Sequence, residues 1–414
     1  MNKKIPSIFI LAVLITSSIT ATITFGQRQH PAETKNLGYS GNYTIQWSYD
    51  YGTDQRTCGR FQGPQPIGDA DNDRKNELLI SGRDGLLRVM KWNDQAQTYT
   101  PVQALRPPLY PLTHCDAGGM AIGDVMNNGK NQIAATWYTA LYQYSNGKYR
   151  LTTFNPWIFF HSGGSSDCLI GDCLNDGKNE LIVSGSGYLQ SSPVGQITVF
   201  RWNGLFLQRV AQWSDPNVTA SYNDNVYMAG LGDVNNDGKN EIVCAYANKI
   251  MVLQWDAGKK AFQSTLIKQY SSDPRVGPFG CVCKDCDGDG KAEILVSFNA
   301  PHITIFKWNG SGYTVQYDHT WQGGDPVIEG IDVGDTDDDG IPNVVAGAGV
   351  THILQWNGTT YVEKATLPTY GEMAVECIGD CDNDGKNEIN AGNVYVDTNG
   401  QHFMEWVFKY EPGT

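Results

Sequence analysis

Asp233-Val-Asn235-Asn-Asp237-Gly238-Lys-Asn-Glu241 is the stretch from which the rest of the chain can be understood. It places oxygen-bearing side chains at positions 1, 3, 5 and 9, with a glycine at position 6. A hard cation such as Ca2+ takes six to eight oxygen ligands at roughly 2.3–2.6 Å, and alternate residues of a tight loop can turn theirs to one centre. Gly238 permits the sharp bend that returns Glu241 as a bidentate ligand. The alternative is an ordinary polar turn, since Asn, Asp and Gly all favour turns.

The same pattern occurs seven times along the chain. Its copies begin at Asp69, Asp124, Asp172, Asp233, Asp285, Asp335 and Asp380, so that successive starts are 55, 48, 61, 52, 50 and 45 residues apart. A turn needs no acid at position 9, yet five copies supply one: Glu77, Glu180, Glu241, Glu293 and Glu388. The repeated acid favours cation binding over a plain turn.

The copies differ in the ligands that they offer. Three are complete, with Asp233, Asn235, Asp237 and Glu241; Asp285, Asp287, Asp289 and Glu293; and Asp380, Asp382, Asp384 and Glu388. The first keeps Asp69, Asp71, Asp73 and Glu77 but has Arg74 in place of the glycine, and the sixth keeps Asp335, Asp337 and Asp339 but ends in Asn343. The third has Leu174 at position 3 and retains Asp172, Asp176 and Glu180. The second has Met126 and Gln132 at positions 3 and 9, and we expect it to bind no metal.

Each repeat predicts four short antiparallel strands. An apolar run ending in Gly-Asp leads into the acidic loop, and a second strand follows at once, as in Glu241-Ile-Val243. A third strand ends in an aromatic residue and a turn, as in Ile305-Phe-Lys-Trp308-Asn-Gly310, and Asn-Gly after alternating apolar residues is a strong hairpin signal. A fourth strand then carries an aromatic residue such as Tyr313. Four strands repeated seven times predict an all-β fold, a seven-bladed β-propeller over residues 39–411.

The two ends of the repeat region predict how the ring closes. The last repeat stops after its third strand, Val407-Phe-Lys-Tyr410, whereas Tyr43–Trp47 is an orphan strand of the fourth-strand type. Pairing these two strands completes one blade and leaves no open edge there. The tryptophans of the third strands are expected to pack within the blades rather than to contact a ligand; they are Trp92, Trp202, Trp255, Trp308 and Trp356.

Residues 1–26 predict an export signal. Lys3 and Lys4 precede an uncharged stretch from Ile5 to about Phe25. No clean cleavage site follows, so an uncleaved N-terminal membrane anchor is the alternative to a cleaved signal peptide, because about 20 residues suffice to span a bilayer. Residues 27–38 are polar and are interpreted as a linker. Both alternatives place the bulk of the chain outside the cytoplasm, either secreted or attached to the cell surface.

Net charge, glycosylation sequons and cysteine content bear on the partners and the location of the chain. The formal charge of −14 argues against a nucleic-acid partner, because the chain has no basic surplus with which to neutralise phosphates. Four N-glycosylation sequons, which begin at Asn42, Asn217, Asn309 and Asn357, fit an exported chain. The ten cysteines could pair in an exported protein, but small buried thiols on inner strands are an equal alternative.

The Gly-Asp-x-[Asp/Asn]-x-Asp-Gly loops resemble those of the FG-GAP/VCBS repeat proteins, whose propeller is that of the integrin α-chain head. The resemblance covers about residues 40–411. It implies Ca2+ in the loop between the first and second strands of a blade, on one face of the ring, and binding partners on the opposite face. The copies in this chain depart from the common form by ending in Glu rather than Asp at position 9.

The nearly complete ligand sets favour structural Ca2+, because a catalytic metal needs an open coordination position. We therefore expect an exported calcium-binding propeller that serves as a secreted or cell-surface interaction or adhesion module. Its partner, a protein or a glycan, would bind the face opposite the calcium loops. The segments that enter the first strands are expected to line that face, since they mix aromatic and polar residues; they include residues 112–116, 157–161, 222–227 and 323–325.

The alternative function is a carbohydrate-binding or polysaccharide-degrading enzyme, a lyase or hydrolase, on the same propeller. Some calcium propellers that this chain resembles act on polysaccharides. His114 with Asp116, and His161 with Asp167, are the candidate acid–base pairs. The sequence contains no Gly-x-Ser-x-Gly elbow, His-Glu-x-x-His helix or phosphate loop. The interaction module is therefore the favoured hypothesis.

Overall fold

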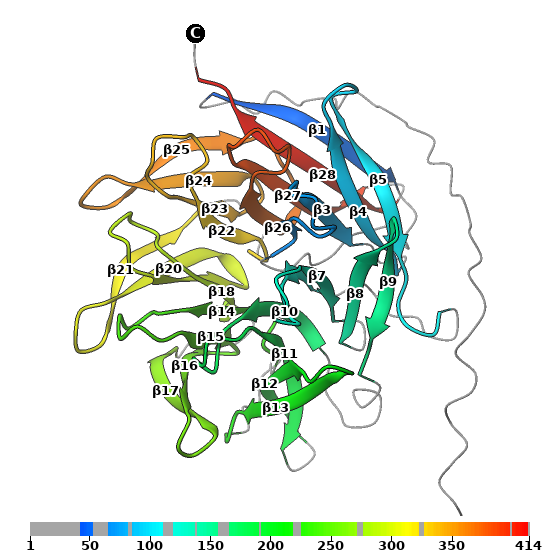
Figure 1. Cartoon of the computed structure of the whole chain (residues 1–414). Coiled ribbons are helices and arrows are strands. Elements are labelled where there is room, and N and C mark those ends of the chain that lie inside the picture. Colours follow the sequence, from blue (N-terminus) through cyan, green and yellow to red (C-terminus); the bar gives the residue numbers. More distant parts are fainter. Residues whose placement is uncertain are drawn as a thin grey trace, which may run out of the picture. The chain divides into compact units, whose positions relative to one another are not determined.

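The computed structural model describes residues 42–52, 65–81, 85–110, 119–136, 139–155, 165–189, 192–217, 225–270, 276–322, 327–397 and 400–412. Within them, 28 strands form seven four-stranded antiparallel sheets, which are the blades of a ring (Figure 1). The predicted seven-bladed propeller is confirmed, and the described residues contain no α-helix. The expected leader of residues 1–26 and the linker of residues 27–38 lie outside the described residues. No described helix is long and apolar enough to cross a membrane.

The blades follow one another in chain order. Blades one and two comprise β2 (Ile67–Gly68), β3 (Glu77–Ser81), β4 (Leu87–Asn93) and β5 (Thr98–Leu105), then β6 (Met120–Gly123), β7 (Gln132–Ala135), β8 (Ala140–Ser145) and β9 (Lys148–Thr153). Blades three and four comprise β10 (Ser165–Gly171), β11 (Glu180–Leu189), β12 (Ser192–Trp202) and β13 (Leu207–Ser214), then β14 (Ala229–Gly232), β15 (Glu241–Tyr246), β16 (Lys249–Asp256) and β17 (Ala261–Gln269).

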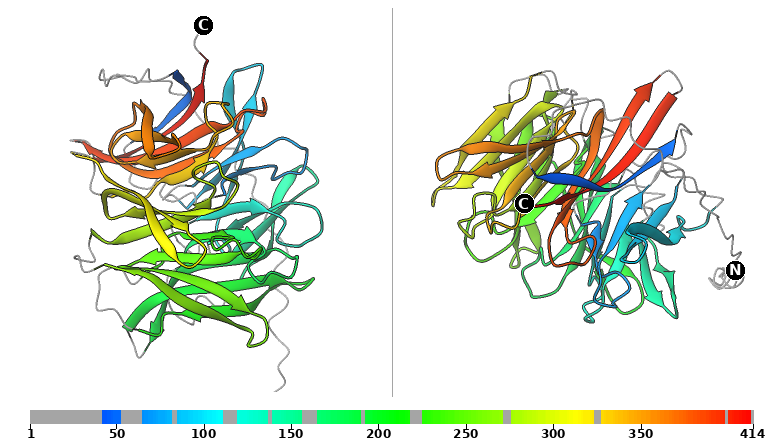
Figure 2. Two further views of the ribbon diagram at one scale, coloured as in Figure 1. Left: turned by 90° about the vertical axis from the view of Figure 1, so that its left-hand side faces the viewer. Right: turned by 90° about the horizontal axis from the view of Figure 1, so that it is seen from above.

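The remaining three blades complete the ring (Figure 2). Blades five and six comprise β18 (Pro278–Lys284), β19 (Glu293–Phe298), β20 (Ala300–Trp308) and β21 (Tyr313–Thr320), then β22 (Ile331–Gly334), β23 (Asn343–Gly347), β24 (Thr351–Trp356) and β25 (Tyr361–Leu367). Blade seven comprises β26 (Glu372–Gly379), β27 (Glu388–Asp397), β28 (Gly400–Tyr410) and, from the other end of the chain, β1 (Tyr43–Gly52).

The hydrophobic core lies between neighbouring blades. Every residue of β15 is buried, whereas most of the outer strand β17 is exposed. Inner strands are covered on both faces, so they are continuously apolar rather than alternating. One core cluster joins Ile182 and Val199 of blade three to Ile242 and Leu253 of blade four, so each blade buries its apolar face only by stacking on the next.

The glycine that precedes six of the seven acidic loops is required by this stacking. A Cβ at Gly68 would lie 3.1 Å from the Ile122 side chain of the next blade, and a Cβ at Gly379 would lie 3.0 Å from Ile67. Contacts this short leave no room for a side chain without displacing the neighbour. Blade five has Lys284 at this position, and its ammonium reaches Asp332 Oδ1 of blade six at 2.5 Å. The recurrent Gly-Asp pair therefore marks the points at which the first strands of neighbouring blades approach each other closely.

The ring closes as the sequence predicts. β1 pairs antiparallel with β28, with Tyr43 opposite Tyr410 and Ser48 opposite Trp406, and the two strands lie side by side in Figure 1. The Glu411 amide also donates a hydrogen bond to the Asn42 carbonyl at 2.7 Å. The β1 strand is longer than the predicted Tyr43–Trp47, because the pairing continues to Gly52.

The third-strand tryptophans pack within the blades, as predicted. Trp92, Trp255, Trp308 and Trp356 each lie 5.0–5.1 Å, between ring centroids, from an aromatic residue of the adjacent fourth strand. Trp202 packs against a core cluster of blades two and three. These tilted or edge-on ring contacts anchor the fourth strand to the third.

The described cysteines are buried, and no disulfide joins any two of them. They are Cys168, Cys173, Cys244, Cys281, Cys283, Cys286, Cys377 and Cys381. The buried-thiol alternative therefore holds for these eight, which fill small spaces on inner strands and loop starts. Cys58 and Cys115 lie outside the described residues.

Deletion of residues 39–48 should destabilise the whole ring, because it removes most of β1 and so exposes the edge of its partner β28 in blade seven. The deleted chain should melt at a lower temperature and aggregate, and a synthetic peptide of residues 39–52 should restore the melting temperature while a scrambled peptide should not. An unchanged melting curve after deletion would contradict the proposed closure.

Candidate functional site

The seven acidic loops lie on one face of the ring. Each connects the first strand of a blade to the second, and antiparallel pairing places these loops on the same side as the turns between third and fourth strands. The C-terminal part of every third strand therefore approaches the acidic loop of its own blade.

The aspartate at position 1 of each loop caps the turn. Asp233 Oδ1 accepts a hydrogen bond from the Asp237 amide at 3.0 Å, and its Oδ2 accepts one from the Gly238 amide at 2.9 Å. Asp69 and Asp172 make the equivalent pairs of bonds. In the sixth loop only Asp335 Oδ2 is bonded, to the Gly340 amide, and its buried Oδ1 has no hydrogen-bond partner in the described structure.

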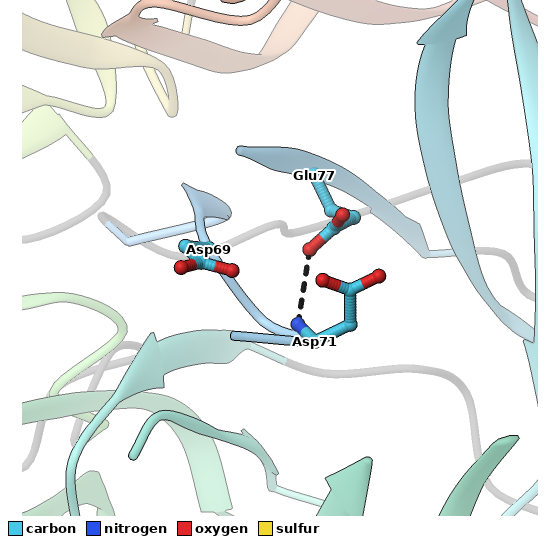
Figure 3. Close-up of side chains that lie close together, drawn as sticks. All are labelled: Asp69, Asp71 and Glu77. Atoms are coloured by element: carbon cyan, nitrogen blue, oxygen red, sulfur yellow. Dashed lines mark hydrogen bonds between the residues drawn. The ribbon is translucent and has the colours of Figure 1, made fainter. Parts of the chain in front are cut away.

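The glutamate at position 9 holds the loop from inside. Glu77 Oε2 accepts hydrogen bonds from the amides of Ala70 at 2.8 Å and Asp71 at 3.2 Å, the second of which is drawn in Figure 3. Two loop amides likewise donate to Glu180 and to Glu388, and one donates to Glu241 and to Glu293. All five glutamate side chains are fully buried.

Neutral residues perform this task in the two remaining loops. Gln132 Oε1 accepts from the Met126 amide at 3.0 Å, and Asn343 Oδ1 accepts from the Thr336 amide at 2.8 Å. The residue at position 9 therefore holds the turn through hydrogen bonds to loop amides, a role that requires no metal ion. The sequence argument, which treated this acid as a sign of metal ligation, had missed it.

Five of the loops bring carboxylate oxygens close enough together to hold a metal ion. The clusters, whose ligand atoms all lie within 4.8 Å of one another, are Asp69, Asp71 and Glu77; Asp172, Asp176 and Glu180; Asp285, Asp287 and Asp289; Asp335, Asp337 and Asp339; and Asp380, Asp382 and Glu388. The fourth loop, complete in sequence, is more open. Its Asn235 Nδ2 donates to Glu241 Oε1 at 3.0 Å, and Asn235 Oδ1 accepts from the Asp237 amide.

Four of the loops also contact a basic side chain of the third strand. Lys91 Nζ lies 3.1 Å from Asp71 Oδ2, 2.5 Å from Asp73 Oδ2 and 2.9 Å from Glu77 Oε1. Lys307 makes the same three contacts in blade five and Lys409 in blade seven, while Arg201 pairs with Asp176 and Glu180 in blade three. The sequence analysis did not single out these four residues.

The fourth and sixth loops instead face a glutamine. Gln254 donates to Asp237 Oδ2 at 2.9 Å, and none of the loop's three carboxylates forms an ion pair within the described part of the chain. Gln355 donates to Asp339 Oδ2 at 2.7 Å. In the sixth loop the Asp337 side chain is only 8% exposed and its Oδ1 has no hydrogen-bond partner among the described residues. The sixth loop thus has two buried carboxylate oxygens without a hydrogen-bond partner in the described structure, Asp335 Oδ1 and Asp337 Oδ1, and such oxygens are suited to bind a cation.

Burial and mutual repulsion dominate the electrostatics of the loops. Burial raises the pKa of all five position-9 glutamates, and the pKa of Glu241 and Glu388 reaches about 7. Burial opposes the charge of Lys91 as well, but its hydrogen bonds to Asp73, Glu77 and Asp71 raise the pKa of its ammonium above the ordinary value. A cation beside each of these five glutamates would therefore offset the cost of burying its charge.

Asparagines connect successive acidic loops around the ring. Asn72, at position 4 of the first loop, donates to the Asn131 carbonyl at 3.2 Å and accepts from the Asn131 amide at 2.7 Å. Asn131, at position 8 of the second loop, returns a bond to the Asp69 carbonyl at 2.8 Å. The same clasp joins Asn127 to Asn179, Asn175 to Asn240 and Asn383 to Asn76.

The clasp is missing on both sides of blade five. Asn236 of the fourth loop makes no such bond in the described structure, and Ala292 at position 8 of the next loop has no side-chain amide to return one. On the other side, the fifth loop has Gly288 at position 4 and the sixth has Pro342 at position 8, so neither can form the clasp. The recurrence of asparagine at positions 4 and 8 is visible in the sequence and could have indicated this contact.

Replacement of Asn72 by alanine should lower the free energy of unfolding by roughly 1–3 kcal/mol, because it leaves the Asn131 amide without its partner. Asn236→Ala is the matched control, since Asn72 and Asn236 share a left-handed backbone with φ of 64° and 59°. Urea unfolding of both variants measures the difference. Equal losses would mean that backbone strain, not the clasp, explains the effect.

The expected partner face is only partly described. Residues 112–116, 157–161 and 323–325, which include His114, Asp116 and His161, lie outside the described residues. Asp167 is buried on β10, where burial raises its pKa to about 8 and its Oδ1 accepts a hydrogen bond from the Cys168 amide. Its place in the candidate pair with His161 therefore stays a prediction.

Several exposed apolar side chains occur on segments that join one blade to the next. Leu109 and Tyr110 follow β5, Val276 precedes β18 and Tyr370 precedes β26, and between 38% and 47% of each is exposed. Antiparallel pairing places these segments on the face opposite the acidic loops. They are the described residues of that face that could contact a partner.

The fold and these loops define a β-propeller with one acidic face. Comparison with protein-family models matches residues 233–296 to the FG-GAP-like repeat, a segment that runs from the acidic loop of blade four to the second strand of blade five. Together with the seven-bladed ring, this match confirms the predicted likeness to an FG-GAP propeller of the integrin-α type.

Solved structures support the same fold. The chain is similar to BBS1N in a crystal structure of BBS1N in complex with ARL6DN, soaked with mercury, with a TM-score of 0.58 and 11% identity over 91% of this chain and 99% of that chain. The same complex soaked with lead gives a TM-score of 0.55 and 12% identity over the same shares. At this identity the likeness shows the fold alone. Comparison with the curated proteins gives no match.

Proposed function

We propose that this chain is an exported, calcium-binding β-propeller that serves as an interaction or adhesion module, either secreted or held at the cell surface. The FG-GAP-type fold suggests an interaction module. Residues 1–26 begin with two lysines and continue as an uncharged, largely apolar stretch, and this order supports export. The partner, a protein or a glycan, would bind the face opposite the acidic loops.

The sixth loop supports the calcium part of the proposal most directly. Asp335, Asp337 and Asp339 converge, and the first two each have a buried oxygen without a hydrogen-bond partner in the described structure. Carboxylate oxygens are the ligands that Ca2+ prefers, and Mg2+ should substitute poorly because it demands a small octahedral shell. The ion would hold together a turn whose carboxylates otherwise repel one another.

The opposite face supports the partner part. Exposed tyrosines are favourable contact residues, since they supply a large rigid surface at low entropic cost. Tyr110 and Tyr370 are about two-fifths exposed on this face. The acidic face is a poorer candidate, because its carboxylates are engaged in holding its own loops.

Chelation should lower the melting temperature of the protein. Binding to the folded state alone stabilises it by about 2.7 kcal/mol per site at a hundredfold excess of ligand over Kd. Asp337→Ala and Asp237→Ala should each remove part of the response to Ca2+, whereas Met126→Ala, in the loop that has one acid, should leave it unchanged. Superimposed melting curves with chelator and with millimolar Ca2+ would contradict calcium binding.

Binding should depend on the tyrosines of the opposite face. The labelled full chain, applied with Ca2+ to arrays of glycans and extracellular proteins, should bind at least one of them, and combined Tyr110→Ser and Tyr370→Ser should weaken binding by roughly tenfold or more. Leu205→Ser is the control, because Leu205 is 77% exposed but lies on the acidic face. An equal loss with Leu205→Ser would contradict the assigned face, and turnover of a polysaccharide would favour the enzyme instead.

A further inference from the structure

The residue directly before the closing aromatic of each third strand occupies an equivalent place in all seven blades. From blade one to blade seven these residues are Lys91, Gln143, Arg201, Gln254, Lys307, Gln355 and Lys409. Basic residues and glutamines therefore alternate from blade one to blade seven, and two basic residues are neighbours where blade seven meets blade one. In each described contact this position faces the acidic loop of its own blade. The choice between a basic residue and a glutamine is therefore better explained by the loop than by strand propensity.

The basic residues stand where a metal ion would have to stand. Lys307 Nζ lies 2.5 Å from Asp287 Oδ2, 2.9 Å from Asp289 Oδ2 and 2.9 Å from Glu293 Oε1. These carboxylates are the ones at positions 3, 5 and 9 of the loop. Ca2+ would need the same oxygens at roughly 2.3–2.6 Å, so the ammonium and the ion cannot occupy the loop together. A loop whose third-strand basic residue keeps these contacts therefore has no room for Ca2+ beside it.

We propose that Lys91, Arg201, Lys307 and Lys409 are built-in cations that take the place of a metal ion in blades one, three, five and seven. Calcium binding is then confined to the loops that begin at Asp233 and Asp335, where the third strand has a glutamine. This second statement rests on the proposed calcium function, whereas the first rests on the observed ion pairs alone.

The charges of the loops agree with this division. Of the six loops with three or four acidic residues in the ligand positions, four have a basic third-strand residue. The second loop has a single acid, Asp124, and its third strand also has an uncharged residue, Gln143, so no cation is needed there. The loops with Gln254 and Gln355 are the exceptions, because each keeps three acids facing a neutral side chain.

The glutamines do not neutralise their loops, but they are compatible with a metal ion. A side-chain amide can present its oxygen to a cation as readily as its NH2 group to a carboxylate. In the sixth loop a nearby basic side chain, Lys364, comes from the fourth strand, and its Nζ lies 3.6 Å from Asp337 and 3.8 Å from Asp339. These distances exceed those of a hydrogen-bonded ion pair, and Lys364 Nζ donates instead to Gln355 Oε1 at 2.8 Å.

The exchange of lysine and glutamine at this position should move calcium sites between blades. The full chain, freed of metal and then titrated with Ca2+, should bind two ions, counted by equilibrium dialysis. Gln254→Lys should bind one ion fewer than the parent. Lys307→Gln should bind one ion more, and its melting temperature should become more sensitive to chelator. Lys307→Arg, which keeps the cation, should bind the same number as the parent.

The outcomes separate this inference from the calcium function itself. A parent chain that binds four or more ions, with no change on Lys307→Gln, would overturn the inference and leave the calcium function intact. A parent chain that binds none, together with a Lys307→Gln variant that gains one, would support the built-in cations and overturn the calcium function. If Lys307→Gln does not fold, Lys91→Gln and Gln254→Lys provide the same comparison, and an unchanged ion count in Gln254→Lys would contradict the division of sites.

Discussion

Every blade depends on the hydrogen bonds that the buried side chain at position 9 of its acidic loop accepts from the loop. The residue at position 9 begins the second strand, accepts hydrogen bonds from the amides at the start of the loop, and so fixes the turn that joins the two innermost strands. This residue is a glutamate in five blades, and in those five turns burial disfavours the charge of its carboxylate. The requirement for a nearby cation follows from the architecture of the turn, whatever supplies it.

The ring adds constraints that no single blade contains. The glycine before each acidic loop allows the first strand of one blade to approach that of the next, and the asparagine clasps join successive loops above this contact. Blade five departs from both rules, since it has Lys284 in place of the glycine and Ala292 in place of the asparagine. Its connections to the neighbouring blades depend instead on the Lys284–Asp332 ion pair and on apolar packing.

The two faces of the ring have different chemistry. On the acidic face the carboxylates contact backbone amides, basic side chains and glutamines of their own blade, and few of their oxygens remain available to a partner. On the opposite face the connections between blades expose aromatic and aliphatic side chains, including Tyr110 and Tyr370. One face is therefore built to maintain the fold, and the other is better suited to recognition.

The sequence by itself determined the number of blades, their four-strand composition, the closure of the ring and the packing of the tryptophans. These features follow from local patterns, namely turn residues at a fixed spacing, strand alternation and an orphan strand at one end. Only the tertiary structure decided which loops already contain a cation, because Lys91 and Asp71 are 20 residues apart and meet across two strands. It also decided the role of the position-9 glutamate and the asparagine clasp, whose partners are 59 residues apart in adjacent blades. A spacing rule within one loop identifies possible ligands, but what neutralises them is set by side chains that the fold brings from elsewhere.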